Sequence, residues 1–367
     1  MSKIFELFGY RLDAWGPDAA SNCMEARCPF MDAECDGGGN RYLSAINLRL
    51  RSDLQKFFPT KTTVQAGVCS LRLRENEQPW IVCPRRLLSL KDGVSRHQTS
   101  VHDHLIRYSG LSKGTRVRVW SEVKMKLATQ TEDDETKSFD YTFDYVLAGS
   151  ERRLLSDVAV LMQKSVRAVK KLAAENGFTV ASRNGEEWIE NFPSDPITIV
   201  EVMTSSTSGG NKENRTQIAM AFEDAVTKGL DHQGPTINYR QVWARMVSQL
   251  IVKSQVGLAW GGKTMWVLQD VLADYISSTT SLDLSRYLAT KLDEVNILAF
   301  GYGQKATSAA ATDDIASLEE AKLYAGPISK SPSDGGFIEI VKIGAAPPKD
   351  ALWKSLFKKK SSGSLTV

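Results

Sequence analysis

Alternating apolar and polar positions predict two neighbouring strands in the first half of the chain. Residues 115–128, TRVRVWSEVKMKLA, have a period of two, with mostly charged side chains on one face and on the other Val117, Val119, Val123, Met125 and Leu127. Residues 137–149, KSFDYTFDYVLAG, show the same period. The acidic stretch TEDDET separates the two runs, so we expect a β-hairpin.

A period of 3.6 residues predicts helices further along the chain. The helix expected over 157–176 has Ser156 as a possible N-cap and Gly177 as a stop signal. Val242, Met246 and Leu250 form one apolar stripe of a later helix. The further helices are expected over 214–229, 238–257 and 265–276.

A third strand, residues 197–203, carries a carboxylate in an apolar row. Ile199, Glu201 and Met203 share one side of this strand, ITIVEVM, because side chains alternate between its faces. A carboxylate there costs free energy unless it is paired or binds a cation. From this strand alone, an ion pair with an Arg or Lys and a metal-binding role fit equally well.

Composition and charge narrow the class of protein. The chain has 367 residues, 42% of them hydrophobic, enough for one large domain or two smaller ones. Lys and Arg total 46 against 43 Asp and Glu, so a nucleic-acid surface would have to be local. The charged N-terminal stretch resembles neither a signal peptide nor a membrane span, and we expect a cytoplasmic protein without a membrane partner.

All five cysteines precede residue 84, in a stretch rich in Gly and Pro. A reducing cytoplasm disfavours disulfides, so grouped cysteines there more often bind metal or perform redox chemistry. Their spacing is not that of a common zinc knuckle, and burial as small hydrophobic side chains fits the spacing as well. We expect a loop-rich subdomain over 1–100, a core over 101–345 and a basic flexible tail over 346–367.

Short blocks spread over the first 260 residues carry a resemblance to a known family. The chain resembles the NotI-type restriction endonucleases, which contain the PD-(D/E)XK nuclease core. The resemblance implies an α/β fold in which helices flank a central mixed sheet. The blocks are FGYRL at 8–12, CPF at 28–30, GVC at 67–69, WIVCPRR at 80–86, SFDYT at 138–142, IVEV at 199–202 and KGLDHQG at 228–234.

Carried over residue by residue, the resemblance implies a catalytic Mg²⁺ site of Asp140, Glu201 and an upstream Glu122. Asp144 is the alternative to Asp140, since both lie on one face of their strand. Carboxylate-bound Mg²⁺ can neutralise a phosphodiester and activate water. The interval from Asp140 to Glu201 is long for the family, because it includes the helix expected over 157–176.

Met203 departs from the family, which usually has glutamine or lysine at that place. Methionine offers neither a proton donor nor a charge. The missing polar group could come from another segment that reaches the same point, and the candidates are Gln217 and then Lys212. Solvent exposure at a helix start is the simpler interpretation of each.

The resemblance also implies a structural metal site of four cysteines. These are Cys28, Cys35, Cys69 and Cys83, and four thiolates suit iron or zinc. Cys23 matches no family block and is expected to be a free thiol.

The implied function is that of a Type II restriction endonuclease. It would cut double-stranded DNA at a palindromic, GC-rich site and act as a homodimer, because a two-fold axis lets paired subunits cut both strands. The alternative is a metal-stabilised DNA-binding protein with a weakened or dead nuclease fold, favoured by Met203. His102 and His104 form a rival metal pair if their segment is a strand.

Overall fold

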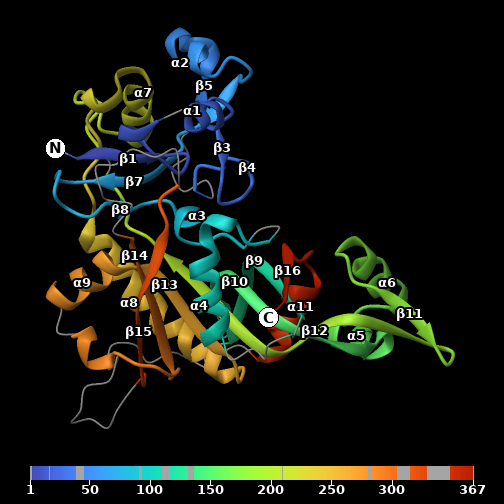
Figure 1. Ribbon diagram of the computed structural model, residues 1–367. Coiled ribbons are helices and arrows are strands. Elements are labelled where there is room, and N and C mark those ends of the chain that lie inside the picture. The colour runs from blue at the N-terminus through green and yellow to red at the C-terminus, as the bar shows by residue number, and fades with distance from the viewer. Residues whose placement is uncertain are drawn as a thin grey trace.

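A mixed β-sheet forms the centre of the molecule. The computed structural model describes residues 2–15, 17–38, 45–90, 93–109, 114, 116–130, 136–208, 210–279, 283–303, 315–328 and 348–366. Within these ranges the central sheet consists of β9 (Arg116–Gln130), β10 (Thr136–Leu154), β11 (Val180–Arg183), β12 (Glu186–Met203), β13 (Lys263–Gln269), β14 (Val295–Tyr302), β15 (Leu318–Gly326) and β16 (Gly363–Thr366). Its order is β15-β14-β13-β12-β10-β9-β16, and β11 pairs with β12 (Figure 1). β13 runs parallel to β12 and β14, whereas the other neighbours are antiparallel.

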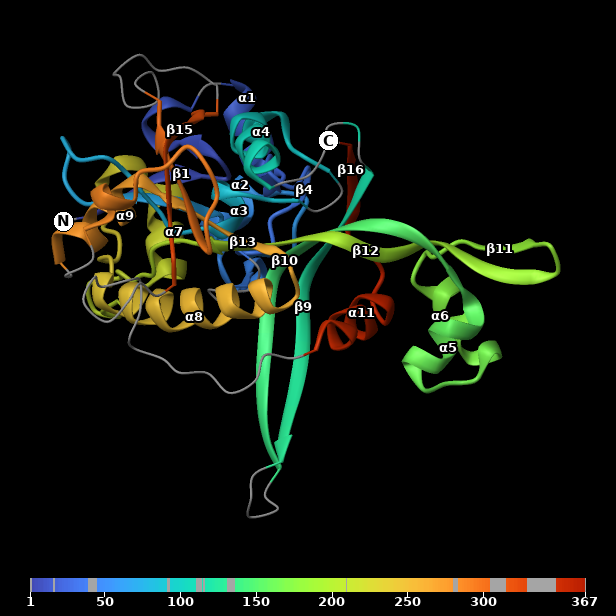
Figure 2. The same ribbon diagram turned by 90° about the horizontal axis from the view of Figure 1, so that it is seen from below.

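Helices cover both faces of this sheet. On one face, α4 (Thr99–Tyr108) packs against β15, and its Val101 and Leu105 belong to the hydrophobic cluster of that face. The other face is covered by α8 (Tyr239–Ala259), α9 (Asp270–Thr279) and α11 (Lys349–Phe357) (Figure 2). The expected α/β architecture, a mixed sheet flanked by helices, is therefore confirmed. Across the described ranges, no helix combines the length and apolar character needed to cross a lipid bilayer.

The predicted hairpin is present as β9 and β10, which project together from the body of the molecule (Figure 2). Val117, Val119 and Val123 are buried, as the alternation predicts. Trp120 stands among the polar positions of the pattern, yet it is fully buried. The reason is α11, whose Trp353 belongs to the same hydrophobic cluster and covers that face.

The predicted helix over 157–176 is wrong in one respect, because it is broken in the middle. The structure has α5 (Leu155–Met162) and α6 (Val166–Glu175). Gln163 between them adopts a left-handed backbone with φ 52°. Ser165 then caps α6, since its side chain accepts a hydrogen bond from the backbone N–H of Ala168 at 3.3 Å.

The helix expected over 265–276 is also wrong in its first half. Residues 263–269 form strand β13, and only α9 is helical. The run Met265 to Leu268 is fully buried between β12 and β14. A short apolar run of this kind does not distinguish a buried strand from a buried helix.

The N-terminal residues form a second unit around a small sheet of order β2-β1-β7-β8 (Figure 1). Its strands are β1 (Lys3–Leu7), β2 (Tyr10–Arg11), β7 (Val68–Arg72) and β8 (Trp80–Ile81), with the pairs β3 (Arg27–Cys28) and β4 (Ala33–Glu34), and β5 (Ala45–Asn47) and β6 (Thr63–Gln65). Its helices are α1 (Pro17–Met24), α2 (Ser52–Phe57) and α3 (Pro84–Leu87). The prediction of a loop-rich segment therefore underestimated its regular structure.

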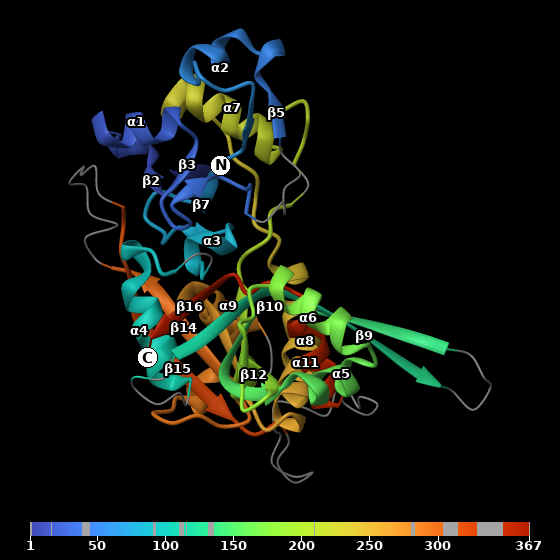
Figure 3. The same cartoon turned by 90° about the vertical axis from the view of Figure 1, so that its right-hand side faces the viewer.

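The expected division at residue 100 is corrected by α7 (Ile218–Lys228), which belongs to the N-terminal unit (Figure 3). Phe222 of α7 packs its ring 5.8 Å from that of Phe8 and 6.2 Å from that of Phe58. Ser2 Oγ donates to the carbonyl of Gly234 at 2.7 Å. α7 and the residues that follow it therefore pack against the start of the chain.

The expected flexible tail over 346–367 is likewise corrected. Its described part contains α11 and β16. Leu352, Trp353 and Phe357 of α11 are buried, and β16 pairs with β9 from Gly363↔Val119 to Thr366↔Arg116. The apolar positions between the lysines account for this packing, because they give α11 a face that the sheet buries.

Candidate active site

Glu122, Asp144 and Glu201 come from neighbouring strands and line one cavity of about 270 Å³. Tyr145 pairs with Ser121 of β9 on one side and with Val200 of β12 on the other. The three carboxylate residues therefore follow one line across the sheet. Glu122 adopts a positive φ of 51°, which is strained for a residue with a side chain.

Asp140 is not brought to this cavity. It is exposed and pairs with Lys126 further along the projecting hairpin. Four residues of strand place it about 13 Å from Asp144 along β10. The alternative, Asp144, is the residue that lies beside Glu201: its Oδ2 accepts a hydrogen bond from the N–H of Val202 at 2.8 Å.

Glu201 is buried, with 2% of its surface exposed. Its Oε2 accepts a hydrogen bond from Lys253 Nζ at 2.5 Å, while its Oε1 is buried without a partner among the described residues. Burial, then the charge of Asp144, raise the pKa of Glu201 to about 8, and Lys253 opposes this rise. A cation bound between Asp144 and Glu201 would remove both the repulsion and the unpartnered oxygen.

Lys253 of α8 brings an amine to Glu201, whereas Met203 offers no polar group there. Neither Gln217 nor Lys212, the residues predicted for this role, lines the cavity. Gln217 precedes α7 in the N-terminal unit, where its carbonyl oxygen accepts from the N–H of Ala221 at 2.8 Å. The sequence offered one signal for Lys253: it directly follows the apolar run Leu250 to Val252 of a helix.

Met203→Gln is expected to leave any cutting activity level or to lower it. Lys253 already reaches Glu201, so an added amide beside it is redundant or obstructs the cavity. Initial rates of DNA cleavage for the variant and the parent protein check this. A gain approaching the ~10²-fold typical of one positioned catalytic group would show instead that Lys253 does not fill the role.

Arg85 connects the cavity to the cysteine-bearing loops. Its Nε donates to Asp36 Oδ2 at 3.1 Å, and its Nη1 donates to the hydroxyl of Tyr145 at 3.0 Å. Its Nη2 lies 3.7 Å from Glu122 Oε1. Asp36 follows Cys35 in sequence, and Arg85 follows Cys83 by two residues. The guanidinium of Arg85 therefore links the cysteine-bearing loops, through Asp36, to the central sheet, through Tyr145.

Four cysteines gather in the N-terminal unit, but the gathering is not a formed metal site. Cys28, Cys69 and Cys83 share one buried cluster, and Cys35 packs against it. The thiol of Cys69 donates a hydrogen bond to Cys83, which raises the pKa of Cys69 and lowers that of Cys83. In the part of the chain that the structure describes, however, no group of three or more His, Cys, Asp or Glu side chains is arranged to bind a metal ion.

Cys23 lies apart from this cluster, as expected for the residue that matches no family block. Its Sγ is 3.8 Å from the carbonyl oxygen of Leu7, and burial alone raises its pKa. By contrast, burial and then the charge of Cys83 raise the pKa of Cys28 to about 12. Repulsion between thiolates is a cost that a bound cation would relieve.

The rival pair of His102 and His104 does not converge. Both lie on helix α4, where side chains two residues apart point in different directions. His102 Nδ1 is 3.6 Å from Asp103 Oδ1, whereas His104 Nδ1 contacts the carbonyl of Ser100 at 2.8 Å. The expectation of a shared metal required a strand and is therefore wrong.

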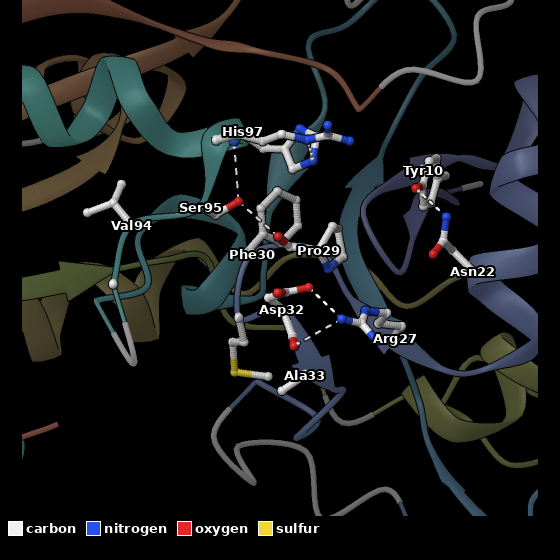
Figure 4. A pocket seen from close by; sticks show the side chains of 13 residues that line it. Tyr10, Asn22, Arg27, Pro29, Phe30, Asp32, Ala33, Val94, Ser95 and His97 are labelled. Atoms are coloured by element: carbon white, nitrogen blue, oxygen red, sulfur yellow. Dashed lines mark hydrogen bonds and ion pairs between the residues drawn. The ribbon is translucent and has the colours of Figure 1, made fainter. Parts of the chain in front are cut away.

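A larger cavity, of about 600 Å³, lies in the N-terminal unit (Figure 4). Its polar groups satisfy one another: Arg27 donates to Asp32 at 2.6 Å, and Asn22 donates to the Tyr10 hydroxyl at 2.9 Å. None of the residues predicted for catalysis lines it. The smaller cavity is therefore the candidate active site.

The smaller cavity combines oxygen ligands suited to a hard cation with two arginines, and Lys253 bonds to one of these ligands, Glu201. Asp144 and Glu201 form its acidic centre, while Arg85 and Arg245 line it as well. Such a set can bind a divalent cation together with an anion. No model of a known protein family matches the chain, and no curated protein matches it.

Proposed function

We propose that the chain is a Mg²⁺-dependent Type II restriction endonuclease of the NotI type, acting on double-stranded DNA in the cytoplasm. The observation that carries the proposal is the meeting of Asp144 and Glu201 in one cavity, with Lys253 bonded to Glu201 Oε2 and with Glu201 Oε1 lacking a partner among the described residues. These are the residue types of a PD-(D/E)XK centre, with the lysine supplied by α8.

Each residue has a distinct role in the proposed reaction. Asp144 and Glu201 would hold Mg²⁺, and Glu122, which lines the same cavity, is the candidate base. The ion supplies charge neutralisation at the phosphate and a more acidic bound water. Lys253 orients Glu201 through its hydrogen bond and favours the ionised form of that carboxylate.

The proposal is tested by incubating the purified protein with phage DNA and Mg²⁺, with EDTA as the control. Discrete fragments support the nuclease, and sequencing of their ends identifies the site. A gel shift without cutting supports the alternative, a DNA-binding protein with an inactive nuclease fold. The lack of a polar group at Met203 favours that alternative. This reason is weakened by Lys253, whose amine bonds to Glu201. Sedimentation with and without DNA tests the proposed homodimer.

We also propose that Cys28, Cys35, Cys69 and Cys83 hold a structural iron or zinc ion. The four side chains already pack together, and bringing the thiolates closer around a cation would offset their mutual repulsion. Because four thiolates leave no open coordination position, the ion would stabilise the N-terminal unit and would not take part in hydrolysis.

Cys69→Ser is expected to remove the bound metal and to lower solubility, whereas Cys23→Ser is expected to change neither. Both residues are buried cysteines of the same unit, so they form a matched pair. Only Cys69 lies in the four-cysteine cluster. Metal analysis of the purified variants by plasma mass spectrometry checks this. Equal metal content in both variants would show that the four-cysteine cluster is not the metal site.

A further inference from the structure

Helix α8 presents a polar row to the candidate active site. Arg245, Gln249 and Lys253 are spaced by four residues, which places them on one side of the helix. Arg245 and Gln249 line the cavity with Asp144 and Glu201, and Lys253 bonds to Glu201. The helix is held in this orientation by its apolar stripe, Val242, Met246 and Leu250, which is buried in the core.

The members of the row differ in burial. Lys253 is buried against Glu201, whereas Gln249 and Arg245 are exposed. Each step of four residues advances about 6 Å along a helix, so Arg245 lies about 12 Å from Lys253 along the axis. The row therefore leads from the acidic centre to solvent, and its outer members are accessible to a large ligand.

A ligand for this row needs polar groups in succession. It also needs at least one negative charge besides that of the phosphate that reacts at the acidic centre. A nucleic-acid backbone has this form, and arginine binds its phosphates through a planar fork of donors. Arg245 and Gln249 are exposed and line the cavity next to its acidic centre, so a backbone that continues past this centre meets them.

We propose that Arg245 and Gln249 bind the DNA backbone next to the phosphate that is cut. Arg245 contacts a neighbouring phosphate as a charged ligand, and Gln249 donates a neutral hydrogen bond between Arg245 and the reacting centre. The inference rests on the proposed nuclease function, because it takes the acidic centre as the position of the reacting phosphate.

The test measures DNA binding in EDTA, where no cutting occurs, over a range of salt concentrations. The probe is a linear phage DNA fragment of defined sequence. Loss of one phosphate contact reduces the slope of log affinity against log salt by about 0.9. Arg245→Ala is expected to show that change, and Arg245→Lys is expected to retain the parent slope. Gln249→Ala is expected to weaken binding about three- to tenfold without changing the slope, because it removes a neutral contact.

Arg286→Ala is the matched control, since Arg286 is 81% exposed on its side chain and does not line the cavity. It is expected to keep the parent slope. An unchanged slope in Arg245→Ala, with a melting temperature equal to that of the parent, overturns the inference, as does a parent protein that does not bind DNA. Binding with the expected slope change but no cutting in Mg²⁺ overturns the nuclease proposal alone.

Discussion

Asp144→Asn is expected to abolish Mg²⁺-dependent cutting, whereas Asp140→Asn is expected to leave the rate within about threefold of the parent. Asp144 lies beside Glu201 in the cavity, and Asp140 is exposed on the projecting hairpin. Asparagine keeps an oxygen that can accept from the Val202 N–H, so the fold is retained while the charge is lost. Loss of a metal ligand's charge prevents the ion from neutralising the phosphate.

The two variants form a matched pair, because each removes one carboxylate from the same strand. Cleavage of phage DNA gives the rates, and calorimetry with Mn²⁺ reports ion binding independently of cutting. Asp144→Asn is expected to lose the binding heat that Asp140→Asn retains. Full activity in Asp144→Asn, or loss of cutting in Asp140→Asn at unchanged melting temperature, would return the metal site to the position implied by the family resemblance.

Lys253→Met is expected to lower the cutting rate by about 10²-fold and to shift its pH dependence upward. The ammonium group favours the ionised form of Glu201, so its removal makes that carboxylate harder to deprotonate. When rates are measured from pH 6 to pH 10, the rate of the variant therefore rises at a higher pH than that of the parent. Lys263→Met, a partly exposed lysine that does not line the cavity, is the control. A lower rate with an unshifted pH profile would mean that Lys253 does not act on Glu201.

The same carboxylate links stability to pH. Its pKa rises from 4.5 to about 8 on folding, mainly through burial and the charge of Asp144. The folded state therefore binds this proton more tightly than the unfolded state does, and proton binding stabilises the fold. This stabilisation is fully present below the unfolded pKa and is lost as pH rises through about 8. Because a bound cation displaces that proton, Mg²⁺ binds more tightly as pH rises across this window.

Local periodicity was sufficient to predict the strands that carry the candidate site. The alternation placed Glu122 on the strand next to that of Asp140 and Asp144, and the carboxylate in the apolar row of β12 singled out Glu201. Periodicity did not decide between Asp140 and Asp144, because both side chains lie on the same face of β10. That choice depends on the register with β12, where Tyr145 faces Val200, and register is set by tertiary packing.

Lys253 illustrates a second limit. Its partner Glu201 lies 52 residues earlier, and no local pattern connects a helix position to a strand position at that separation. The helical stripe of Val242, Met246 and Leu250 predicted which side of α8 is buried, but not which strand the adjacent side meets. The same reason explains why α7 was assigned to the core, since its contacts with Phe8 and Phe58 are visible only in the folded chain.

Strand β16 has a consequence for the order in which the molecule can be completed during synthesis. It covers the edge of β9, and Lys359 just before it donates to the backbone carbonyl of Glu122 at 2.8 Å. A ribosome makes β9 long before it makes these residues, and nascent chains fold as their segments emerge. The backbone that carries Glu122 therefore gains this support only once residues 359–366 have emerged, and a chain that stops short of β16 lacks it.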